Sequence, residues 1–193
     1  PEFFPDESSL IATLEEGLST IKKPTSLVIG AQGRCARGVR YFLKKMQLDK
    51  TLLYKKDTEN KTSYSEILKH DLFFNCVYLR EKTVPFVTNE QLTKTTNLSI
   101  IADISCDPNS PYNPLPIYKK ITTFKKPTVR VAKDPLPVDV MAIDHLPSFL
   151  PKESSNDFSG QLLPHLLELL EKGNTSPVWT RAEEFFNAHT KEI

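Results

Sequence analysis

Short apolar runs without polar alternation are the feature that most constrains how this chain can fold. They are rich in β-branched and aromatic residues, and they occupy residues 26–29, 52–54, 72–78 and 98–104. A strand without alternation is buried on both faces, as in a parallel sheet covered by helices. Stretches with helical spacing lie between the runs, at residues 36–46, 63–69 and 88–95. We therefore predict the α/β class, with a doubly wound parallel sheet and flanking helices.

Both ends of the chain are expected to be helical. Residues 7–21 place apolar side chains at a spacing of about 3.6 residues, which predicts an amphipathic helix. Residues 153–171 and 178–191 are predicted as two further helices, so the sheet is followed by a C-terminal helical extension. Pro164 is expected at a break or at the start of a helix, because proline lacks the backbone N–H that a helix interior uses.

Charge and composition exclude several classes of function. The chain of 193 residues carries 25 basic and 24 acidic side chains, which leaves no excess of positive charge for binding a nucleic acid. No apolar run approaches the length of a membrane span, and no signal-peptide pattern opens the chain. Three cysteines at irregular spacing favour a reducing compartment over a disulfide scaffold or a metal site. We therefore expect a cytoplasmic protein that uses no metal, nucleic acid or membrane.

A glycine-rich segment follows the first predicted strand and opens a predicted helix. Gly30, Gly33 and Gly38 lie in the sequence GAQGRCARG, which departs from the usual G-x-G-x-x-G spacing of dinucleotide-binding turns. Without side chains at Gly30 and Gly33, the backbone can approach a pyrophosphate, and the helix N-terminus offers unpaired N–H groups to it. The alternative is a tight turn between strand and helix that binds no ligand.

An acidic residue follows the second predicted strand. Asp57 stands where a carboxylate can accept hydrogen bonds from the hydroxyls of an adenosine ribose. Because the same carboxylate repels a 2′-phosphate, NAD is favoured over NADP, although Lys55 and Lys56 stand beside it. The alternative is an ordinary aspartate of a turn. Together with the glycine segment, Asp57 predicts a Rossmann-like, dinucleotide-binding domain.

These observations divide the chain into three segments. Residues 1–22 form a connecting helix, residues 23–150 form the dinucleotide-binding domain, and residues 151–193 form C-terminal helices. The last segment is expected to pack on the sheet or on an N-terminal domain that is missing. The chain begins at Pro1 without an initiator methionine, so we expect it to be cut from a longer protein.

Five stretches together resemble a known family of enzymes. They are KPTSLVIGAQGRCARG (23–38), FFNCVYL (73–79), IIADISCDPNSPYNPLPIY (100–118), KKPTVRV (125–131) and IDHLPSFLPKESS (143–155). They resemble the C-terminal part of the NAD-dependent, L-lysine-forming saccharopine dehydrogenases of the fungal lysine pathway. The resemblance implies the NAD-binding portion of an oxidoreductase that acts on a CH–NH bond. That enzyme cleaves saccharopine to L-lysine and 2-oxoglutarate, as the last step of the α-aminoadipate pathway of lysine biosynthesis.

The resemblance also implies which residues form the site. The acid/base pair, a lysine and a histidine, is expected in the absent N-terminal domain, so this chain alone is expected to be inactive. The implied substrate contacts are Ser105, Cys106 and Asp107. The implied cofactor contacts are Gly33 and Arg34 at the phosphates, Asp57 at the ribose, Tyr78 at the adenosine, Ile104 at the nicotinamide ribose, and Ile143, Asp144, His145 and Leu146 at the nicotinamide end.

The residues themselves support part of this site. Residues 104–107 follow the fourth predicted strand, and open parallel sheets bind ligands at the carboxyl ends of their strands. There Asp107 can pair with an amino group of the substrate, or it can cap the proline-rich turn that follows. His145 is not expected to act as a base, because hydride transfer at this point needs positioning beside the nicotinamide ring more than proton transfer.

Two cysteines are expected at the same edge of the sheet. Cys35 begins the helix after the glycine segment, and Cys76 ends the third predicted strand. The resemblance implies a disulfide between them, which we expect to form only under oxidation. The alternative is a pair of buried cysteines that pack as small hydrophobic residues.

A function of a different class stays open at this point. The chain can be a non-catalytic binding module derived from the same enzyme, which binds a nucleotide or a partner without turnover. Another dehydrogenase, similar to alanine dehydrogenase, shares the fold but fits residues 143–155 less well. An upstream α/β domain with a lysine and a histidine in the full-length gene favours the enzyme over the module.

Overall fold

The computed structural model describes residues 3–190. Two compact units are present: residues 8–146 make up the first, and residues 3–7 together with 147–190 make up the second. The first unit contains the sheet that the sequence predicts, whereas the second is helical. The predicted segments 1–22 and 151–193 each extend beyond the described residues, at positions 1–2 and 191–193.

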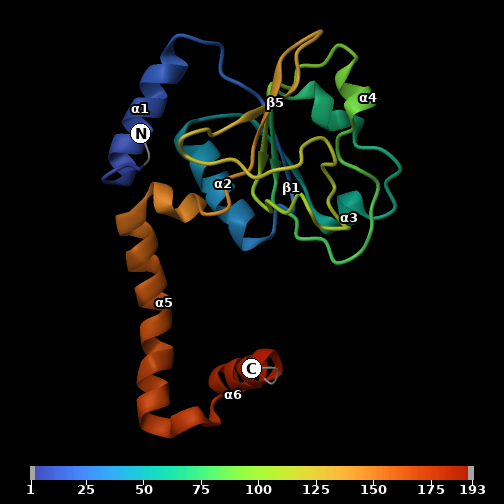
Figure 1. Ribbon diagram of the computed structural model, residues 1–193. Helices are drawn as coiled ribbons and strands as arrows, with labels where there is room; N and C mark the ends of the chain where they lie inside the picture. The colour runs from blue at the N-terminus through green and yellow to red at the C-terminus, as the bar shows by residue number, and fades with distance from the viewer. Residues whose placement is uncertain (1–2, 191–193) are drawn as a thin grey trace. The chain divides into compact units, whose positions relative to one another are not determined.

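A six-stranded sheet forms the centre of the first unit (Figure 1). The strands are β1 (Ser26–Ile29), β2 (Lys50–Leu53), β3 (Leu72–Asn75), β4 (Ile100–Asp103), β5 (Val129–Ala132) and β6 (Val138–Met141). They lie in the order β2-β1-β3-β4-β6-β5, and every neighbouring pair is parallel except β6 and β5, which are antiparallel. The predicted α/β class, with a Rossmann-like parallel sheet and flanking helices, is thereby confirmed.

The edge strand β5 departs from the purely parallel sheet that the sequence predicted. It runs antiparallel to β6, with a bulge between Arg130 and Ala132. Only residues 133–137 separate the two strands, and so short a connection permits a hairpin but no crossover. The Asp134–Pro135 peptide bond in this turn is cis. The guanidinium of Arg130 pairs with the carboxylate of Asp139 across the hairpin, with Nε 2.7 Å from Oδ1.

Helices connect the parallel strands of the first unit. They are α1 (Glu7–Ser19) before the sheet, α2 (Arg34–Lys45) after β1, and then α3 (Lys55–Thr58), the 3-10 helix η1 (Ser65–Lys69) and α4 (Asn89–Leu92). The helices predicted at 63–69 and 88–95 are therefore shorter than expected. After α4 the chain contains Thr93, Thr95 and Thr96, and β-branched residues of this kind lower helix propensity.

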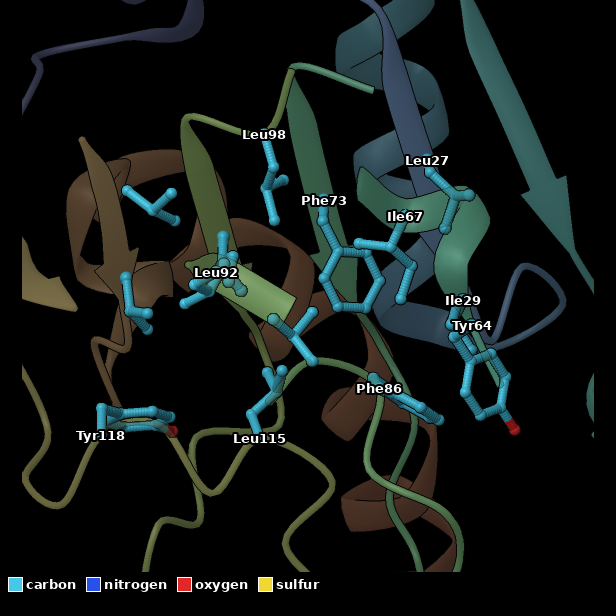
Figure 2. Packing of buried hydrophobic residues seen from close by; sticks show 14 of the residues in the cluster. Leu27, Ile29, Tyr64, Ile67, Phe73, Phe86, Leu92, Leu98, Leu115 and Tyr118 are labelled. Carbon is cyan, nitrogen blue, oxygen red and sulfur yellow. The ribbon is translucent and has the colours of Figure 1, made fainter. Parts of the chain in front are cut away.

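The sheet is buried on both faces, as the runs without alternation predict. Leu27 and Ile29 of β1 join one hydrophobic cluster, whereas Val28 between them joins the other. The first cluster packs β3 and β4 against η1 and α4, around the fully buried Phe73 (Figure 2). The second cluster packs α1 and α2 against the opposite face, around Leu43.

The second unit is built from two helices. α5 (Pro151–Lys172) and α6 (Pro177–Thr190) are joined by the 3-10 turn η3 (Gly173–Thr175). The indole N–H of Trp179 donates to the carbonyl of His165 at 2.9 Å and so ties α6 to α5. Pro164 lies inside α5, so the expected break is wrong. One missing N–H removes a single hydrogen bond, and the remaining bonds of the 22-residue helix carry it past the proline.

The lengths and compositions of the helices bear on membrane association. Within residues 3–190, no helix is long and apolar enough to cross a membrane.

Candidate functional site

The order of the strands reverses between β1 and β3. β2 pairs with one side of β1 and β3 pairs with the other, so the connections that leave β1 and β3 turn to opposite faces of the sheet. In open parallel sheets a ligand-binding crevice forms at such a point, outside the carboxyl ends of the strands. Ile29 pairs with Asn75 at this end, and the segments that begin at Gly30 and Cys76 border the crevice.

A cavity of about 810 Å³ lies at this point of the sheet. Its walls come from the ends of β1 and β3 and from the segment around α3. Residues that line it include Gly30, Gly33, Lys55, Glu59, Tyr78 and Arg80. A cavity of this size suits a cofactor or a ligand of similar dimensions. Two of the predicted cofactor contacts, Gly33 and Tyr78, therefore face one shared space, and 73% of Tyr78 is exposed there.

The glycine turn permits a close approach that no other residue allows. Gly30 has φ +85°, and a Cβ at this position would lie 2.8 Å from the carbonyl oxygen of Cys76 and from a methyl of Val77. The amide of Gly33 donates to the carbonyl of Gly30 at 2.9 Å, which closes the turn. The absence of a side chain at Gly30 thus permits the turn that brings the α2 N-terminus up to the edge of the sheet.

The start of α2 is suited to an anion. Gly33 is the N-cap of this 12-residue helix, and no side chain caps it. The first N–H groups of a helix lack partners within the helix, and they carry its partial positive charge. Arg34 is the first helical residue and is exposed beside them. The predicted phosphate contacts, Gly33 and Arg34, are thus adjacent at one helix end.

Asp57 has a local partner that the sequence did not indicate. Its Oδ2 accepts a hydrogen bond from the backbone N–H of Tyr54 at 2.9 Å, so the carboxylate caps the short helix α3. The lining of the large cavity includes its neighbours Lys55 and Thr58. Asp57 therefore lies beside the cavity with one oxygen engaged, and a carboxylate still has lone pairs for a further donor.

Four charged residues of the cavity lining, Glu59, Arg80, Glu81 and Lys82, were missed by the sequence analysis. Glu59 is exposed in the cavity lining and pairs with Lys55, with 3.5 Å between Nζ and Oε1. Arg80 lines the same space from the segment after β3. The position of Glu59 two residues beyond Asp57 was the available signal, because both follow the second strand. Arg80 stands in an irregular segment whose path the sequence does not predict.

A buried polar network lies at the carboxyl ends of β3 and β4, and the sequence analysis missed it as well. Asn75 and Asp103 are register partners, and the Asn75 amide Nδ2 donates to Asp103 Oδ1 at 2.9 Å. The hydroxyl of Tyr118 donates to Asp103 Oδ2 at 2.7 Å. Burial, followed by the charge of Asp103 and this hydrogen bond, raises the pKa of Tyr118 above its ordinary value, so the phenol stays a donor. The available signal was a polar residue at the end of each apolar run.

The predicted substrate contacts form a turn directly after β4. The hydroxyl of Ser105 donates to the carbonyl of Val77 at 2.5 Å, and the N–H of Cys106 donates to Asp103 Oδ1 at 3.2 Å. Cys106 has φ +50°. Asp107 is exposed and borders a second, small cavity of about 20 Å³, which has room for about one water molecule. Ser105 and Asp107 thus share a small pocket next to the large one.

The predicted contacts at the nicotinamide end lie after β6. Ile143 is buried and forms an isolated parallel bridge with Thr122, whereas Asp144 and His145 are exposed. The imidazole of His145 packs edge-on against the ring of Phe124, with centroids 5.1 Å apart. Leu146 begins the 3-10 turn η2 (Leu146–Phe149).

Electrostatics link these two segments. Burial first, and then the charges of Asp103, Asp144 and Asp107, raise the pKa of Cys106 to about 11. The segment after β6 therefore reaches the turn after β4. Among the described residues that line the large cavity, none belongs to either segment. The structure thus brings the predicted phosphate and adenosine contacts together, and it groups the predicted substrate contacts separately beside them.

Cys35 and Cys76 lie close enough to influence each other. Burial, and after it the charge of Cys35, raises the pKa of Cys76 to about 12. Cys35 is exposed in the first turn of α2, and Cys76 is half-buried after β3. Both are free cysteines in the structure, as is Cys106. The disulfide between Cys35 and Cys76 stays a prediction for the oxidised chain.

The described residues hold no group of three or more histidine, cysteine, aspartate or glutamate side chains that could bind a metal ion. Three of the four histidines, His70, His145 and His189, instead have local partners for their imidazole rings. His70 shares a 2.8 Å hydrogen bond with the hydroxyl of Thr51, and His189 stacks on Phe185 with centroids 4.2 Å apart.

Several known proteins are similar to this chain and share a name. A saccharopine dehydrogenase of Candida glabrata, named NAD(+)-dependent and L-lysine-forming, is 42% identical over 97% of the chain. Proteins of the same name from Neurospora crassa and Schizosaccharomyces pombe are 42% and 38% identical over 96% and 98% of it. The chain is similar to saccharopine dehydrogenase. No family model matches it.

The match covers one part of those enzymes. It extends over 53% of the Candida glabrata and Neurospora crassa proteins and 55% of the Schizosaccharomyces pombe protein. The chain thus spans about half the length of the curated relatives it matches, and the matched half is the C-terminal one. The resemblance predicted from the five sequence stretches is confirmed in both respects.

The close approach at Gly30 gives a prediction. We expect Gly30→Ala to lower the free energy of unfolding by about 2 kcal/mol or more, because the positive φ and the backbone of Cys76 both oppose a Cβ. Gly38→Ala is the matched control: it lies in α2 with open space around it, and we expect it to raise stability by about 0.5–1 kcal/mol. Urea denaturation measures both. Equal effects of the two substitutions would contradict the account of the turn.

The raised pKa of Cys76 gives a second prediction. A thiol reacts as its thiolate, so its alkylation rate rises about tenfold per pH unit below its pKa. With a pKa of about 12, Cys76 should react faster and faster from about pH 7 to about pH 10 without reaching a plateau. Peptide mapping by mass spectrometry after timed alkylation follows Cys76 alone, with a short cysteine peptide as control. A plateau for Cys76 at the pH where the peptide levels off would contradict its burial.

Proposed function

We propose that the chain is the NAD-binding portion of a saccharopine dehydrogenase. One observation carries the proposal: a large cavity at the reversal point of the sheet adjoins the glycine turn and the uncapped start of α2. Similarity to enzymes that are named for NAD(+) and for L-lysine formation supports the identity of the ligand. The first unit would supply the cofactor seat and one wall of the substrate cleft.

The residues present fit a dinucleotide. The N–H groups after Gly33 would donate to the pyrophosphate, because no side chain caps this helix end. Arg34 would add a positive charge beside these groups. Tyr78 would stack its ring along the adenosine, because it is exposed in the same cavity.

The ribose is expected to contact a carboxylate at the α3 end of the cavity. We assign this role to Asp57, whose second oxygen would accept from a ribose hydroxyl while Oδ2 stays bonded to Tyr54. A carboxylate there disfavours a 2′-phosphate by repulsion, so NAD would be preferred over NADP. Glu59 lines the cavity more directly and is the competing candidate.

The substrate would bind at the carboxyl end of β4. Ser105, Cys106 and Asp107 would face it, with the Asp107 carboxylate placed to attract its amino group. Ile104 and residues 143–146 would enclose the nicotinamide end. When bound there, NAD would supply the hydride acceptor for the oxidative cleavage of saccharopine to L-lysine and 2-oxoglutarate. Proton transfer would fall to a lysine and a histidine of the N-terminal half.

A cellular location is part of the same proposal. Three free cysteines and the likeness to metabolic enzymes fit a reducing compartment, and we assign the protein to the cytoplasm. Under oxidation, Cys35 and Cys76 would pair, and the bond would hinder NAD binding because Cys35 adjoins the pyrophosphate seat. The C-terminal helices would pack on the sheet or on the N-terminal half of the enzyme.

A second candidate is a non-catalytic binding module. The same cavity supports it, because ligand binding there needs no acid/base residue. Such a module would bind the dinucleotide in the same cavity without turnover, so cofactor binding alone does not distinguish it from the enzyme portion.

Cofactor selectivity gives the first functional prediction. We expect the chain to bind NADH weakly and in preference to NADPH, and Asp57→Ala to weaken NADH binding by about tenfold, as for the loss of a hydrogen bond to a charged group. Fluorescence titration measures the affinities. Asp57→Asn is the control for the cap, because its amide oxygen still accepts from Tyr54 while the charge is lost. Equal affinity for both cofactors, or a loss with Glu59→Gln but not with Asp57→Ala, would contradict the assignment.

Turnover gives the second functional prediction. We expect no NADH production from saccharopine and NAD by the 193-residue chain, because positioned proton transfer typically contributes about a hundred- to ten-thousandfold. The full-length Candida glabrata relative serves as the positive control under the same conditions. Steady NADH production by the chain alone would show that acid/base residues lie within it.

A further inference from the structure

Asn75 and Asp103 are polar residues buried where a hydrophobic core would suffice. Their exposed fractions are 0% and 1%, and they end the two central strands β3 and β4 as register partners. An amide–carboxylate hydrogen bond of 2.9 Å joins them. A buried carboxylate is tolerated only where hydrogen-bond donors compensate its lost hydration. The groups that are bonded to Asn75 and Asp103 therefore indicate the role of the pair.

The partners on the β3 side lead to the cofactor cavity. Asn75 Oδ1 accepts a hydrogen bond from the N–H of Val77 at 3.2 Å, and the carbonyl of Val77 accepts one from the hydroxyl of Ser105 at 2.5 Å. Val77 is therefore held at both of its backbone polar groups. It lines the large cavity between Cys76 and Tyr78, so fixing its backbone also fixes this wall of the cavity.

The partners on the β4 side lead to the predicted substrate turn. Asp103 Oδ1 accepts from the N–H of Cys106 at 3.2 Å, in addition to the bond from Asn75. Cys106 has φ +50°, which a residue with a side chain rarely adopts unless it is held in place. Tyr118 supplies the third donor to Asp103. Tyr118 is not part of the turn after β4, and it is not among the described residues that line the large cavity.

We propose that Asn75 and Asp103 act as a positioning pair, which holds the cofactor wall at Val77 and the substrate turn at Cys106 in one fixed arrangement. The role rests on the proposed function of the cavity. An apolar pair would fill the same space with comparable stability, but it would give neither backbone N–H a fixed acceptor. The pair thus couples two segments that are more than twenty residues apart in sequence.

The first test separates positioning from stability. Asn75→Leu removes the acceptor of Val77, and we expect the dissociation constant of NADH to rise about tenfold. Tyr118→Phe is the matched control: it also removes one hydrogen bond from the buried network, yet we expect NADH affinity within about twofold of the unchanged chain. Urea denaturation of both variants gives the folded fraction, by which the affinities are corrected.

A milder variant covers the case in which Asn75→Leu does not fold. Ser105→Ala removes only the bond to the Val77 carbonyl from a partly exposed position, and we expect it to weaken NADH binding by about threefold. The cofactor half of the proposal would be overturned if both Asn75→Leu and Ser105→Ala left the NADH affinity unchanged. If Asn75→Leu does not fold, an unchanged affinity in Ser105→Ala would overturn it. An equal loss of affinity in Tyr118→Phe would also overturn it, because the effect would then follow stability alone.

The second test reads the substrate turn without any cofactor. Asp103→Ala removes the carboxylate that accepts from the N–H of Cys106, and we expect this N–H to exchange with deuterium about tenfold faster relative to the N–H of Val28 in β1. Asp139→Ala removes a carboxylate of β6 that pairs with Arg130 of β5, and this matched control should leave the relative rate unchanged.

The two readouts separate this proposal from the function on which it rests. If the unchanged chain binds no NADH, the cofactor assignment fails, and the exchange of the Cys106 N–H alone then decides whether the pair holds the turn. If NADH binds but Asp103→Ala leaves the exchange rate unchanged, the proposed function stands and the positioning role of Asp103 is wrong.

Discussion

At Gly30 the backbone leaves β1 with φ +85° and passes so close to the next strand that a Cβ would lie 2.8 Å from the carbonyl oxygen of Cys76. This approach lets the turn close onto Gly33, and it brings the start of α2 to the reversal point of the sheet. The cavity, the uncapped helix end and the cysteine pair all depend on it. A side chain at this position would separate β1 from the segment after β3 and displace the surface that we assign to the pyrophosphate.

Much of the fold could be predicted because its main signal is local. The runs without alternation around Val28 and Phe73 predicted buried parallel strands. In the structure these runs are β1 and β3, which pair in parallel and contact both hydrophobic clusters. The antiparallel β5 was missed because a short proline-containing turn, rather than the strand itself, decides its direction. Pro164 was expected at a break or at the start of a helix, but it lies inside α5. The other hydrogen bonds of this long helix outweigh the single one that proline removes.

The site could be predicted only where sequence neighbours also stay neighbours in space. Gly33 and Arg34 meet at one helix end as expected, and Tyr78 faces the same cavity. The cap that Asp57 forms depends on the geometry of a four-residue helix, which the sequence does not specify. The pair of Asn75 and Asp103 depends on strand register, so two distant residues become partners only once the sheet is formed. Resemblance supplied the functional roles, and physical chemistry supplied the placement.

We propose that NAD binds at the carboxyl ends of β1 and β3. A titration of the ¹⁵N-labelled chain with NADH, followed by two-dimensional amide NMR, locates the binding site. We expect concentration-dependent shifts for the amides of Gly30, Gly33 and Tyr78, with the amides of the β5–β6 turn unmoved. Shifts confined to other parts of the sheet, or to α5 and α6, would contradict this proposal.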